Sequence, residues 1–508
     1  MRSRLTLEER ITAGVWGQDW RDTERELMEI WLSQPETFES LIEPRDVAHV
    51  PYAGDLANVK RFAERWRADR AFREALPADP YGVAARYGLP CDPEELRFLW
   101  DEAFAASRDG DWIAPLVVQR YHLFTREKLL HREKLRAVEC VPSDERHRRW
   151  RARQIKRTLA HLGPRHHDGI IHAPFAIELS DGCSVGCWFC GVSAGRKRGD
   201  FLYTPDNARL WRDVLAVLRR AVGPAAASGF CYWATDPLDN PDYERFALDV
   251  AEICGRFPQT TTAQPLKDAE RTRALLALSV AHGCTINRFS ILTLRAFDAV
   301  MAAFTAEELL HCEIVSQNPE AVHIQGNAGR ARGSERLART ARGHGLGAID
   351  WRQVPGTIAC VSGFLLNMVE RRVRLVTPCP ASDRWPDGYW VLDDARFGDA
   401  DDLERLIDRM MDRAMPVSLG PGEAARFRPD LTFRPIEAGF ELVGVGATSR
   451  LEGAPIVQEM GRAVAAGDHT VGEILGELAA RDGRAPDSAR RLLDQIFEGG
   501  FLDEEPRG

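Results

Sequence analysis

Apolar and polar residues follow two different periods in the central part of the chain. Short apolar runs of strand length fall at residues 175–179, 229–233, 260–263, 285–292 and 321–325. Stretches with apolar residues at helical spacing lie between them, at residues 205–221, 241–256, 269–282 and 305–312. Strands that alternate with helices are typical of a parallel sheet whose helices cover its outside. The pattern therefore predicts an α/β fold over residues 166–385, with its chemistry at the carboxyl ends of the strands.

The helical period dominates residues 1–165. Apolar residues recur at helical spacing in segments such as 24–32 and 58–66, and prolines at positions 35, 44 and 51 separate the early segments. We therefore expect an N-terminal all-helical domain over residues 1–165.

The strand period returns after residue 355. Two apolar runs within residues 356–380 predict a β-hairpin whose turn lies near Val369 and Glu370. Polar, Asp-rich sequence then predicts a connector over residues 386–430, with one helix at residues 401–411.

The last part of the chain predicts a small separate module over residues 431–508. Residues 431–445 indicate two strands, and amphipathic helices follow near residues 454–465, 471–480 and 488–498. Two strands and three helices are the elements of a winged-helix-like module.

Length and composition describe an ordinary globular protein. The 508 residues suffice for about three domains. A formal net charge of −9 argues against a broad nucleic-acid-binding surface, and no run reaches the roughly 18 apolar residues that a membrane span needs. Residues 1–10 lack the apolar core of a signal peptide, and the eleven cysteines are mostly scattered. We therefore expect reduced thiols in a cytoplasmic protein, with neither nucleic acid nor membrane as a partner.

Cys183, Cys187 and Cys190 break that scattered pattern, because C-x3-C-x2-C spacing places three thiolates on one short loop. Ferredoxins close a cubic iron–sulfur cluster with a fourth cysteine, and zinc sites use four ligands. The neighbouring cysteines here are distant, at Cys140 and Cys231. The spacing therefore favours a 4Fe-4S cluster with one iron open to a small chelating molecule. A structural zinc site or a redox-only cluster is the alternative.

The Cys spacing, the aromatic Phe189 before the last cysteine and the preceding apolar strand resemble the radical S-adenosyl-L-methionine (SAM) enzymes. The resemblance implies a partial (β/α)6 barrel with a 4Fe-4S cluster on the three cysteines. It also implies that SAM binds the open iron through its amino and carboxylate groups, with Phe189 near the adenine.

Further segments are similar to the SAM-binding strands of that family. Ala234-Thr-Asp-Pro237 stands where the family carries Gly-Gly-Glu-Pro, so Thr235 and Asp236 are implied to lie at the SAM amino group. Here the two glycines are replaced and Asp236 stands in place of Glu. Backbone carbonyls of this segment would still accept hydrogen bonds from the SAM amino group. Arg288-Phe-Ser-Ile291 implies Ser290, and His323-Ile-Gln-Gly-Asn327 implies Asn327, as SAM contacts. An ordinary strand-end hydrogen bond is the alternative for each.

Three segments narrow the resemblance. Residues 190–195, 201–211 and 357–364 resemble the radical SAM amino acid epimerases of proteusin-type pathways, which act on ribosomally made peptides. The likeness spans about residues 165–385. It implies that a 5′-deoxyadenosyl radical removes Hα from an L-residue of a precursor peptide, and that a Cys thiol returns a hydrogen atom to leave a D-residue.

The donor thiol has two candidates, Cys360 and Cys379. No cysteine follows Cys379, so the ligands of an auxiliary cluster are incomplete. Pro378 and Pro380 flank Cys379 and predict a strand end at an edge or mouth. Cys360 lies in an apolar run, where a buried small hydrophobe is the alternative. We favour Cys379 as the donor, with Cys360 as a candidate partner for its re-reduction.

Partners follow from the same resemblance. The module at residues 431–508 resembles the RiPP recognition element, which adds a leader peptide to its sheet as a strand. This implies a leader-guided precursor peptide, and the radical chemistry implies an electron donor such as flavodoxin or ferredoxin. The basic run at residues 146–157 predicts a solvated helix face, or else a grip for an acidic peptide or RNA.

Three other functions remain open on these residues. One is a radical SAM maturase that forms carbon–carbon or thioether crosslinks in a peptide, and such enzymes usually carry auxiliary clusters. A second is RNA modification, which would use the basic run. The third is a peptide-holding scaffold without catalysis, against which the intact cysteine triad argues.

Overall fold

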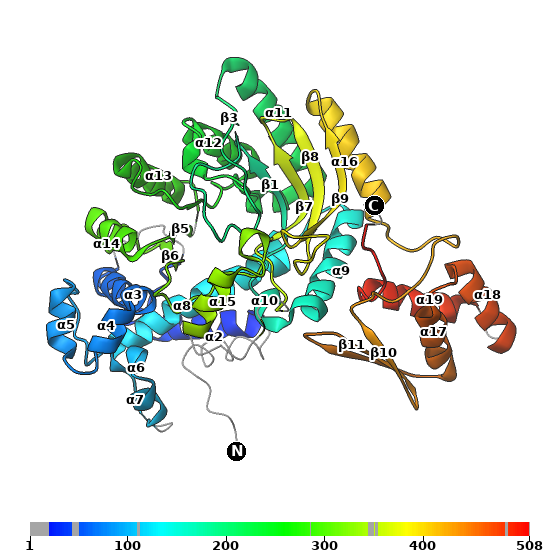
Figure 1. Cartoon of the computed structure of the whole chain (residues 1–508), viewed down its shortest axis with the longest axis horizontal. Helices are drawn as coiled ribbons and strands as arrows, with labels where there is room; N and C mark the ends of the chain where they lie inside the picture. Colours follow the sequence, from blue (N-terminus) through cyan, green and yellow to red (C-terminus); the bar gives the residue numbers. More distant parts are fainter. Residues whose placement is uncertain are drawn as a thin grey trace.

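The computed structural model describes residues 20–42, 50–108, 112–284, 286–343, 350, 354–482 and 486–506. Helices form one end of the molecule, a mixed α/β region forms its middle, and a small module forms the other end (Figure 1). The mixed α/β class predicted from the two periods is confirmed.

Every regular element that the structure describes before residue 165 is helical. The longest are α3 (Ala53–Ala68), α8 (Leu116–Lys134) and α9 (Glu145–Leu162). The others are α2 (Trp20–Ser33), α4 (Arg70–Ala75), α5 (Pro80–Arg86), α6 (Arg97–Trp100), α7 (Glu102–Ala106), α10 (Pro164–His167) and the π-helical turn Leu135–Glu139. The helices α3 to α8 share an apolar core with Phe62, Phe72 and Phe124 at its centre.

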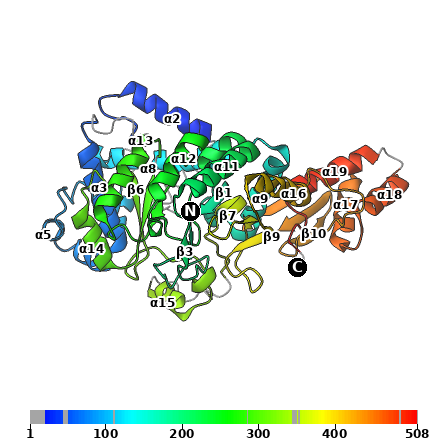
Figure 2. The ribbon, with the colours of Figure 1, turned by 90° about the horizontal axis from the view of Figure 1, so that it is seen from above.

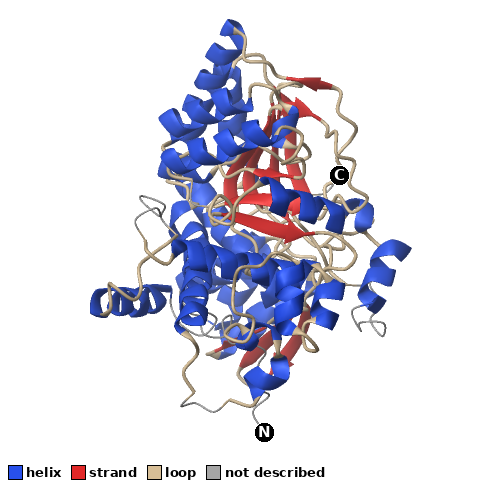
Figure 3. Cartoon of the chain, turned by 90° about the vertical axis from the view of Figure 1, so that its left-hand side faces the viewer, coloured by secondary structure: helices blue, strands red, loops and turns tan. Residues whose placement is uncertain are grey.

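The main sheet has the strand order β1-β7-β8-β9. Its strands are β1 (Ala173–Glu178), β7 (Val361–Asn367), β8 (Arg372–Pro378) and β9 (Tyr389–Arg396). β7 lies parallel to β1, and β8 is antiparallel to both of its neighbours. The predicted hairpin with its turn at Val369 and Glu370 is therefore confirmed. Helices cover one face of this sheet (Figure 3).

A second, parallel sheet has the order β4-β5-β6. It contains β4 (Thr261–Thr262), β5 (Asn287–Ile291) and β6 (Cys312–Ser316). The helices on the outside of the α/β region are α11 (Pro205–Val222), α12 (Tyr243–Cys254), α13 (Ala269–Ala281), α14 (Leu294–Ala303) and α16 (Ala400–Ala414). Residues 229–233, predicted as a strand, make a single parallel bridge, between Phe230 and Ala176 of β1.

Two predicted elements are wrong. Residues 305–311 form turns rather than a helix, and Lys60 Nζ donates to the carbonyls of Leu309 and Cys312 at 2.9 and 2.8 Å. The strand that follows is β6, not residues 321–325. That segment is held as a turn, in which the Val322 amide donates to the Arg67 carbonyl.

The segment 386–430 is more than the predicted connector. β9 forms the edge of the main sheet beside β8, and α16 packs on α11. Both elements therefore complete the α/β layer instead of linking two domains across solvent.

The C-terminal module has three strands followed by three helices. They are β10 (Thr432–Ile436), β11 (Gly439–Val443), β12 (Thr448–Glu452), α17 (Pro455–Ala466), α18 (Val471–Asp482) and α19 (Pro486–Glu498). The predicted helices are confirmed, and β12 is one strand more than the sequence pattern showed. The module has its own apolar core, which includes Phe440 and Met460, and projects from one end of the molecule (Figure 2).

The basic run of α9 has a buried side that joins parts of the molecule and an exposed side that includes Arg148. Arg151, Arg153 and Arg157 are each at most 3% exposed. Arg157 donates to the Pro378 carbonyl of β8 at 2.6 Å, and Arg153 pairs with Glu504 of the C-terminal tail at 3.0 Å. The predicted solvated face is therefore confirmed only in part, because these three arginines serve internal contacts.

In the part of the chain that the structure describes, the helices are too short or too polar to cross a bilayer.

Candidate functional site

The three predicted ligand cysteines lie on a loop that leaves the carboxyl end of β1. Short strands β2 (Ser180–Asp181) and β3 (Gly199–Asp200) pair antiparallel and close the base of this loop. Gly182 has φ +78°, and a Cβ there would lie 2.4 Å from the Arg196 carbonyl oxygen. Because only glycine fits this approach, the loop can turn sharply just before Cys183.

The thiols of Cys183, Cys187 and Cys190 are all half-buried. Burial, together with smaller effects of the neighbouring Cys183 and Cys190 thiolates, raises the pKa of Cys187 to about 11. The Ala194 amide donates to Cys190 Sγ at 3.3 Å. Three mutually interacting thiols that disfavour a shared negative charge are a donor set that a cation would stabilise.

Within the described ranges, no group of three His, Cys, Asp or Glu side chains converges on one metal position. A 4Fe-4S cluster would take each thiolate on a different iron. Cys183, Cys187 and Cys190 are the residues of this loop that would hold it.

Gly329 and Arg330 clamp this loop from outside. Arg330 donates from Nη1 to the Cys187 carbonyl at 2.8 Å and from its amide to the Cys190 carbonyl at 3.0 Å. Gly329 has φ +55°, and a Cβ there would lie 2.3 Å from the Cys190 carbonyl oxygen. The sequence analysis did not predict these contacts. A Gly-Arg pair is common in sequences, so nothing in the local pattern marks Gly329 and Arg330 as partners of the loop.

The turn after residue 233 lies against the cysteine loop. Asp236 accepts hydrogen bonds from the Leu238 amide, the Thr262 hydroxyl and the Ala263 amide at 3.0, 2.8 and 2.7 Å. Its carboxylate is thus fully used in tying the turn to β4, and burial raises its pKa. Its charge also raises the pKa of Cys183, after the larger effect of burial, so the two groups lie close.

Thr235 is the residue of this turn that the fold leaves unsatisfied. Its Oγ1 atom is buried and has no hydrogen-bond partner within the protein. Buried hydroxyls normally have a partner, so an orphaned one beside the cysteine loop is a place for a ligand atom.

Ser290 lies on a solvent-facing side of β5. Asn287, Phe289 and Ile291 are buried toward the helices, whereas Arg288 is exposed and Ser290 is half-buried on the opposite face. Alternation along a strand places Arg288 and Ser290 on the same face. The inner face of the second sheet is therefore open to solvent.

Asn327 and Phe189 are two further residues for which SAM contacts were predicted. Asn327 donates to the Val354 carbonyl at 2.7 Å and accepts from the Gly333 amide at 3.0 Å, so its amide joins three loop segments. Phe189 is half-buried and packs edge-to-face on Trp188. Asn327 thus has a structural role at the position where a SAM contact was predicted.

The structure separates the two candidate donor thiols. Cys379 is 1% exposed and lies beside Arg157 of α9, so the prediction of a thiol at an edge or mouth is wrong. Cys360 is half-buried and packs with Tyr232 and Trp233 in the cluster that includes Ala176 and Leu365. The alternate residues Phe175 and Phe364 face the cluster of the outer helices instead. Cys360 therefore belongs to the inner face and Cys379 to the side under α9.

Glu178 at the end of β1 is a site residue that the sequence analysis missed. Its buried carboxylate accepts from the Ala234 amide at 2.8 Å and from Asn367 Nδ2 at 3.1 Å. Burial raises the pKa of Glu178, and the nearby Arg374 opposes this. Glu178 thereby holds the turn at residue 234 against β1 and β7.

These observations define a mixed α/β protein with a three-cysteine loop at the carboxyl end of its first strand. The chain is 39% identical over 456 residues to the uncharacterized protein y4wI of Sinorhizobium fredii, and the match covers 89% of this chain and 88% of that protein. The chain belongs to the family of that protein.

No model of a known protein family matches the chain. Among solved structures, a crystal structure of BtrN in complex with AdoMet and 2-DOIA matches with a TM-score of 0.26 and 14% identity. The match covers 40% of this chain and 71% of BtrN, and a TM-score this low supports no conclusion.

Proposed function

We propose that this protein is a radical SAM enzyme that holds a 4Fe-4S cluster on Cys183, Cys187 and Cys190. The observation that carries the proposal is the meeting of the three-cysteine loop with the 234–239 turn. Residues 229–233 also link β1 to β4, through the Phe230 bridge and a 3.0 Å bond between Thr261 and Tyr232. The succession β7, β1, 229–233, β4, β5, β6 is what a partial (β/α)6 barrel requires.

SAM would be held by groups that the fold leaves free. Thr235 supplies a buried hydroxyl that has no hydrogen-bond partner within the protein. Ser290 adds a half-buried hydroxyl on the inner face of β5. When bound, the cluster and SAM supply a carbon-centred radical that can remove a hydrogen atom.

The reaction that we propose is conversion of L- to D-residues in a ribosomally made precursor peptide. The Cα–H bond of the bound residue breaks, and the hydrogen atom leaves from one face. Cys360 then gives the hydrogen atom of its S–H bond to the opposite face, so the peptide keeps its composition and inverts one centre. The thiyl radical left on Cys360 needs one electron and one proton, which a flavodoxin or ferredoxin and water would supply.

Burial supports Cys360 as this donor. It raises the pKa of the Cys360 thiol to about 12, against a smaller opposing effect of Arg288. The thiol is therefore protonated at neutral pH and carries a hydrogen atom to give. Cys379 has an equally raised pKa of about 12, but it lies away from the inner face.

Isotope labelling tests the reaction. The enzyme and a precursor peptide encoded near it would be co-expressed in heavy water, and the peptide mass measured. We expect the mass of one deuterium for one hydrogen at each converted residue, with no other change. A peptide that loses hydrogen or gains a crosslink instead would contradict epimerisation.

Two cysteine variants test the donor. We expect Cys360→Ala to cleave SAM upon reduction and to form no D-residues, because the abstraction step is intact and the return step is lost. Cys379→Ala is the matched control, and we expect it to retain epimerisation. Loss of D-residues in Cys379→Ala alone would assign the donor to Cys379.

The C-terminal module is the part that we propose binds the leader of the precursor. Its sheet has an open edge, because β12 pairs with β11 alone among the described strands. A leader strand would add its main-chain hydrogen bonds to such an edge. Fluorescence anisotropy with a labelled leader peptide tests this, and unchanged affinity after Arg450→Pro in β12, which removes an amide that faces away from β11, would contradict it.

A peptide crosslinking enzyme is the second candidate, favoured by the hairpin β7–β8 with its two cysteines. Iron content distinguishes the two. About four irons per chain fits one cluster and epimerisation, whereas about eight fits an added auxiliary cluster.

A further inference from the structure

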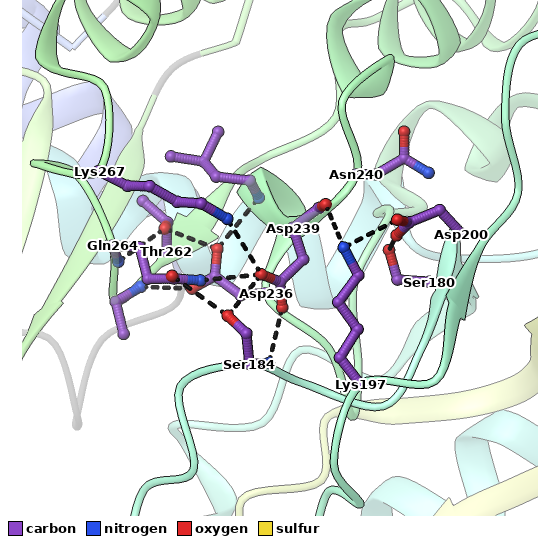
Figure 4. A network of polar contacts seen from close by, with 12 residues as sticks. Ser180, Ser184, Lys197, Asp200, Asp236, Asp239, Asn240, Thr262, Gln264 and Lys267 are labelled. Carbon is purple, nitrogen blue, oxygen red and sulfur yellow. Dashed lines mark hydrogen bonds and ion pairs between the residues drawn. The ribbon is translucent and has the colours of Figure 1, made fainter.

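Asp239 grips the residue that follows the first ligand cysteine. Its fully buried carboxylate accepts from the Ser184 amide at 2.8 Å and from the Ser184 hydroxyl at 2.6 Å. Gln264 donates to the same carboxylate at 3.2 Å. Figure 4 shows these bonds meeting at one side chain between the loop and the end of β4. A charged acceptor with three donors is a strong and directional anchor.

The main chain of Asp239 holds the returning end of the same loop. Lys197 Nζ donates to the Asp239 carbonyl at 2.7 Å and pairs with Asp200 of β3 at 2.8 Å. One residue thus fixes the loop on both sides of the three cysteines, at Ser184 and at Lys197.

Asp239 also belongs to the turn predicted to bind SAM. It ends the 3-10 turn Pro237–Asp239, whose first residue follows Asp236. Asp236 caps that turn at the Leu238 amide and bonds β4 at Thr262. A displacement of the cysteine loop therefore requires a displacement of the 234–237 segment as well.

From this geometry we infer that Asp239 is a positioning residue that locks the cluster loop to the SAM-binding turn and places a buried negative charge beside the cluster. The inference rests on the proposed function. Lys267 lies 3.5 Å from the carboxylate but is half-exposed, so water weakens its compensation. Because cluster potential depends on nearby charge and solvent exposure, Asp239 holds the potential more negative.

The test compares Asp239→Asn with Ser184→Ala. Asparagine keeps the shape of the side chain and removes its charge, whereas Ser184→Ala removes the hydroxyl that bonds Asp239 and Gln264 and removes no charge. We expect Asp239→Asn to shift the reduction potential of the cluster to a less negative value and to lose iron several-fold faster to a chelator. Ser184→Ala should lose iron faster with little shift in potential. An unchanged potential and unchanged iron loss in Asp239→Asn would overturn the inference.

Asp249→Asn is the control for the loss of a buried carboxylate. Asp249 is similarly buried, but it bonds Tyr203 and Arg212 away from the cysteine loop. We expect wild-type potential and iron retention in this variant. An equal effect in both variants would show that general destabilisation, rather than positioning, is responsible.

A measurement without the cluster separates this inference from the proposed function. In the iron-free protein, the Ser184 amide is bonded to Asp239, so its hydrogen exchange should be slow and should become at least tenfold faster in Asp239→Asn. Unchanged exchange would overturn the positioning role. Suppose that Asp239→Asn speeds the exchange of the Ser184 amide but the wild-type protein takes up no iron. That result would contradict the proposed cluster, and it would still support Asp239 as the residue that positions the loop.

Discussion

Single residues decide whether the cysteine loop can form, and Gly329 is the most sharply constrained of them. It combines a positive φ with a close approach to the Cys190 carbonyl. We predict that Gly329→Ala lowers the free energy of unfolding by more than about 1 kcal/mol, because the added methyl group is strained by both effects. Urea unfolding measures this change, and iron content should fall in parallel.

Gly186 provides the matched control for that substitution. It also has a positive φ, of +66°, but no atom lies within 4 Å of the position that a Cβ would take. Gly186→Ala should therefore show the smaller loss of stability, since it has strain without a clash. Equal losses in the two variants would mean that backbone strain alone decides, and that the contact with Cys190 contributes nothing.

The residue scale also shows what a sequence can and cannot indicate about a site. The cysteine triad could be singled out because its three residues lie within one loop at a distinctive spacing. Cys379 was misplaced because its two flanking prolines define a strand end, but they do not say that α9 covers it. Asp239 and Glu178 act through contacts with Ser184 and Ala234, far from them in sequence, so no local pattern shows their roles.

At the scale of elements, α9 acts as the connection between the sheet and the C-terminal module. Its basic run looks like a solvated helix when it is read alone. The acidic and carbonyl partners that bury it come from β8, α16 and the tail, and only the fold brings them together. The same reasoning explains β6, whose preceding turn depends on Lys60 of a distant helix.

Arg157 is the residue through which that role of α9 can be tested. Its guanidinium donates to the Pro378 carbonyl and to Gln154, and it stacks on the Trp390 ring. We predict that Arg157→Leu costs about 1–3 kcal/mol for each buried polar group left without a partner. Arg148→Leu, on the exposed face of the same helix, should change stability by less than about 0.5 kcal/mol. Chemical denaturation of the two variants gives the comparison, and similar midpoints would contradict it.

At the scale of the whole molecule, the C-terminal tail completes the structure. After α19 the chain returns across the module, where Asp503 pairs with Arg426, and reaches the α/β region, where Glu504 pairs with Arg153. Glu505 accepts from Trp385 Nε1 at 2.7 Å. A leader peptide bound to the module would therefore be held at a fixed position relative to the cysteine loop, as a leader-guided enzyme requires.

Buried histidines determine how the stability of the whole molecule depends on pH. Burial lowers the pKa values of several to about 4 from a usual value near 6.5, and these residues are His122, His147, His161 and His167. His172, beside α9, is lowered well below its usual value for the same reason. Below pH 6.5 the unfolded chain binds protons that the folded protein does not. The stability from these groups is thus complete above pH 6.5 and is lost as pH falls toward 4.

We therefore predict a steep loss of stability between pH 6.5 and pH 4, before most carboxylates titrate. Each histidine contributes up to about 1.4 kcal/mol per unit of pKa difference between the two states. Urea unfolding at half-unit steps of pH gives the slope. His147→Gln removes one such group and should make the slope shallower by up to one proton. A stability that stays constant down to pH 5 would show that the folded protein binds these protons as readily as the unfolded chain does, and would contradict the lowered pKa values.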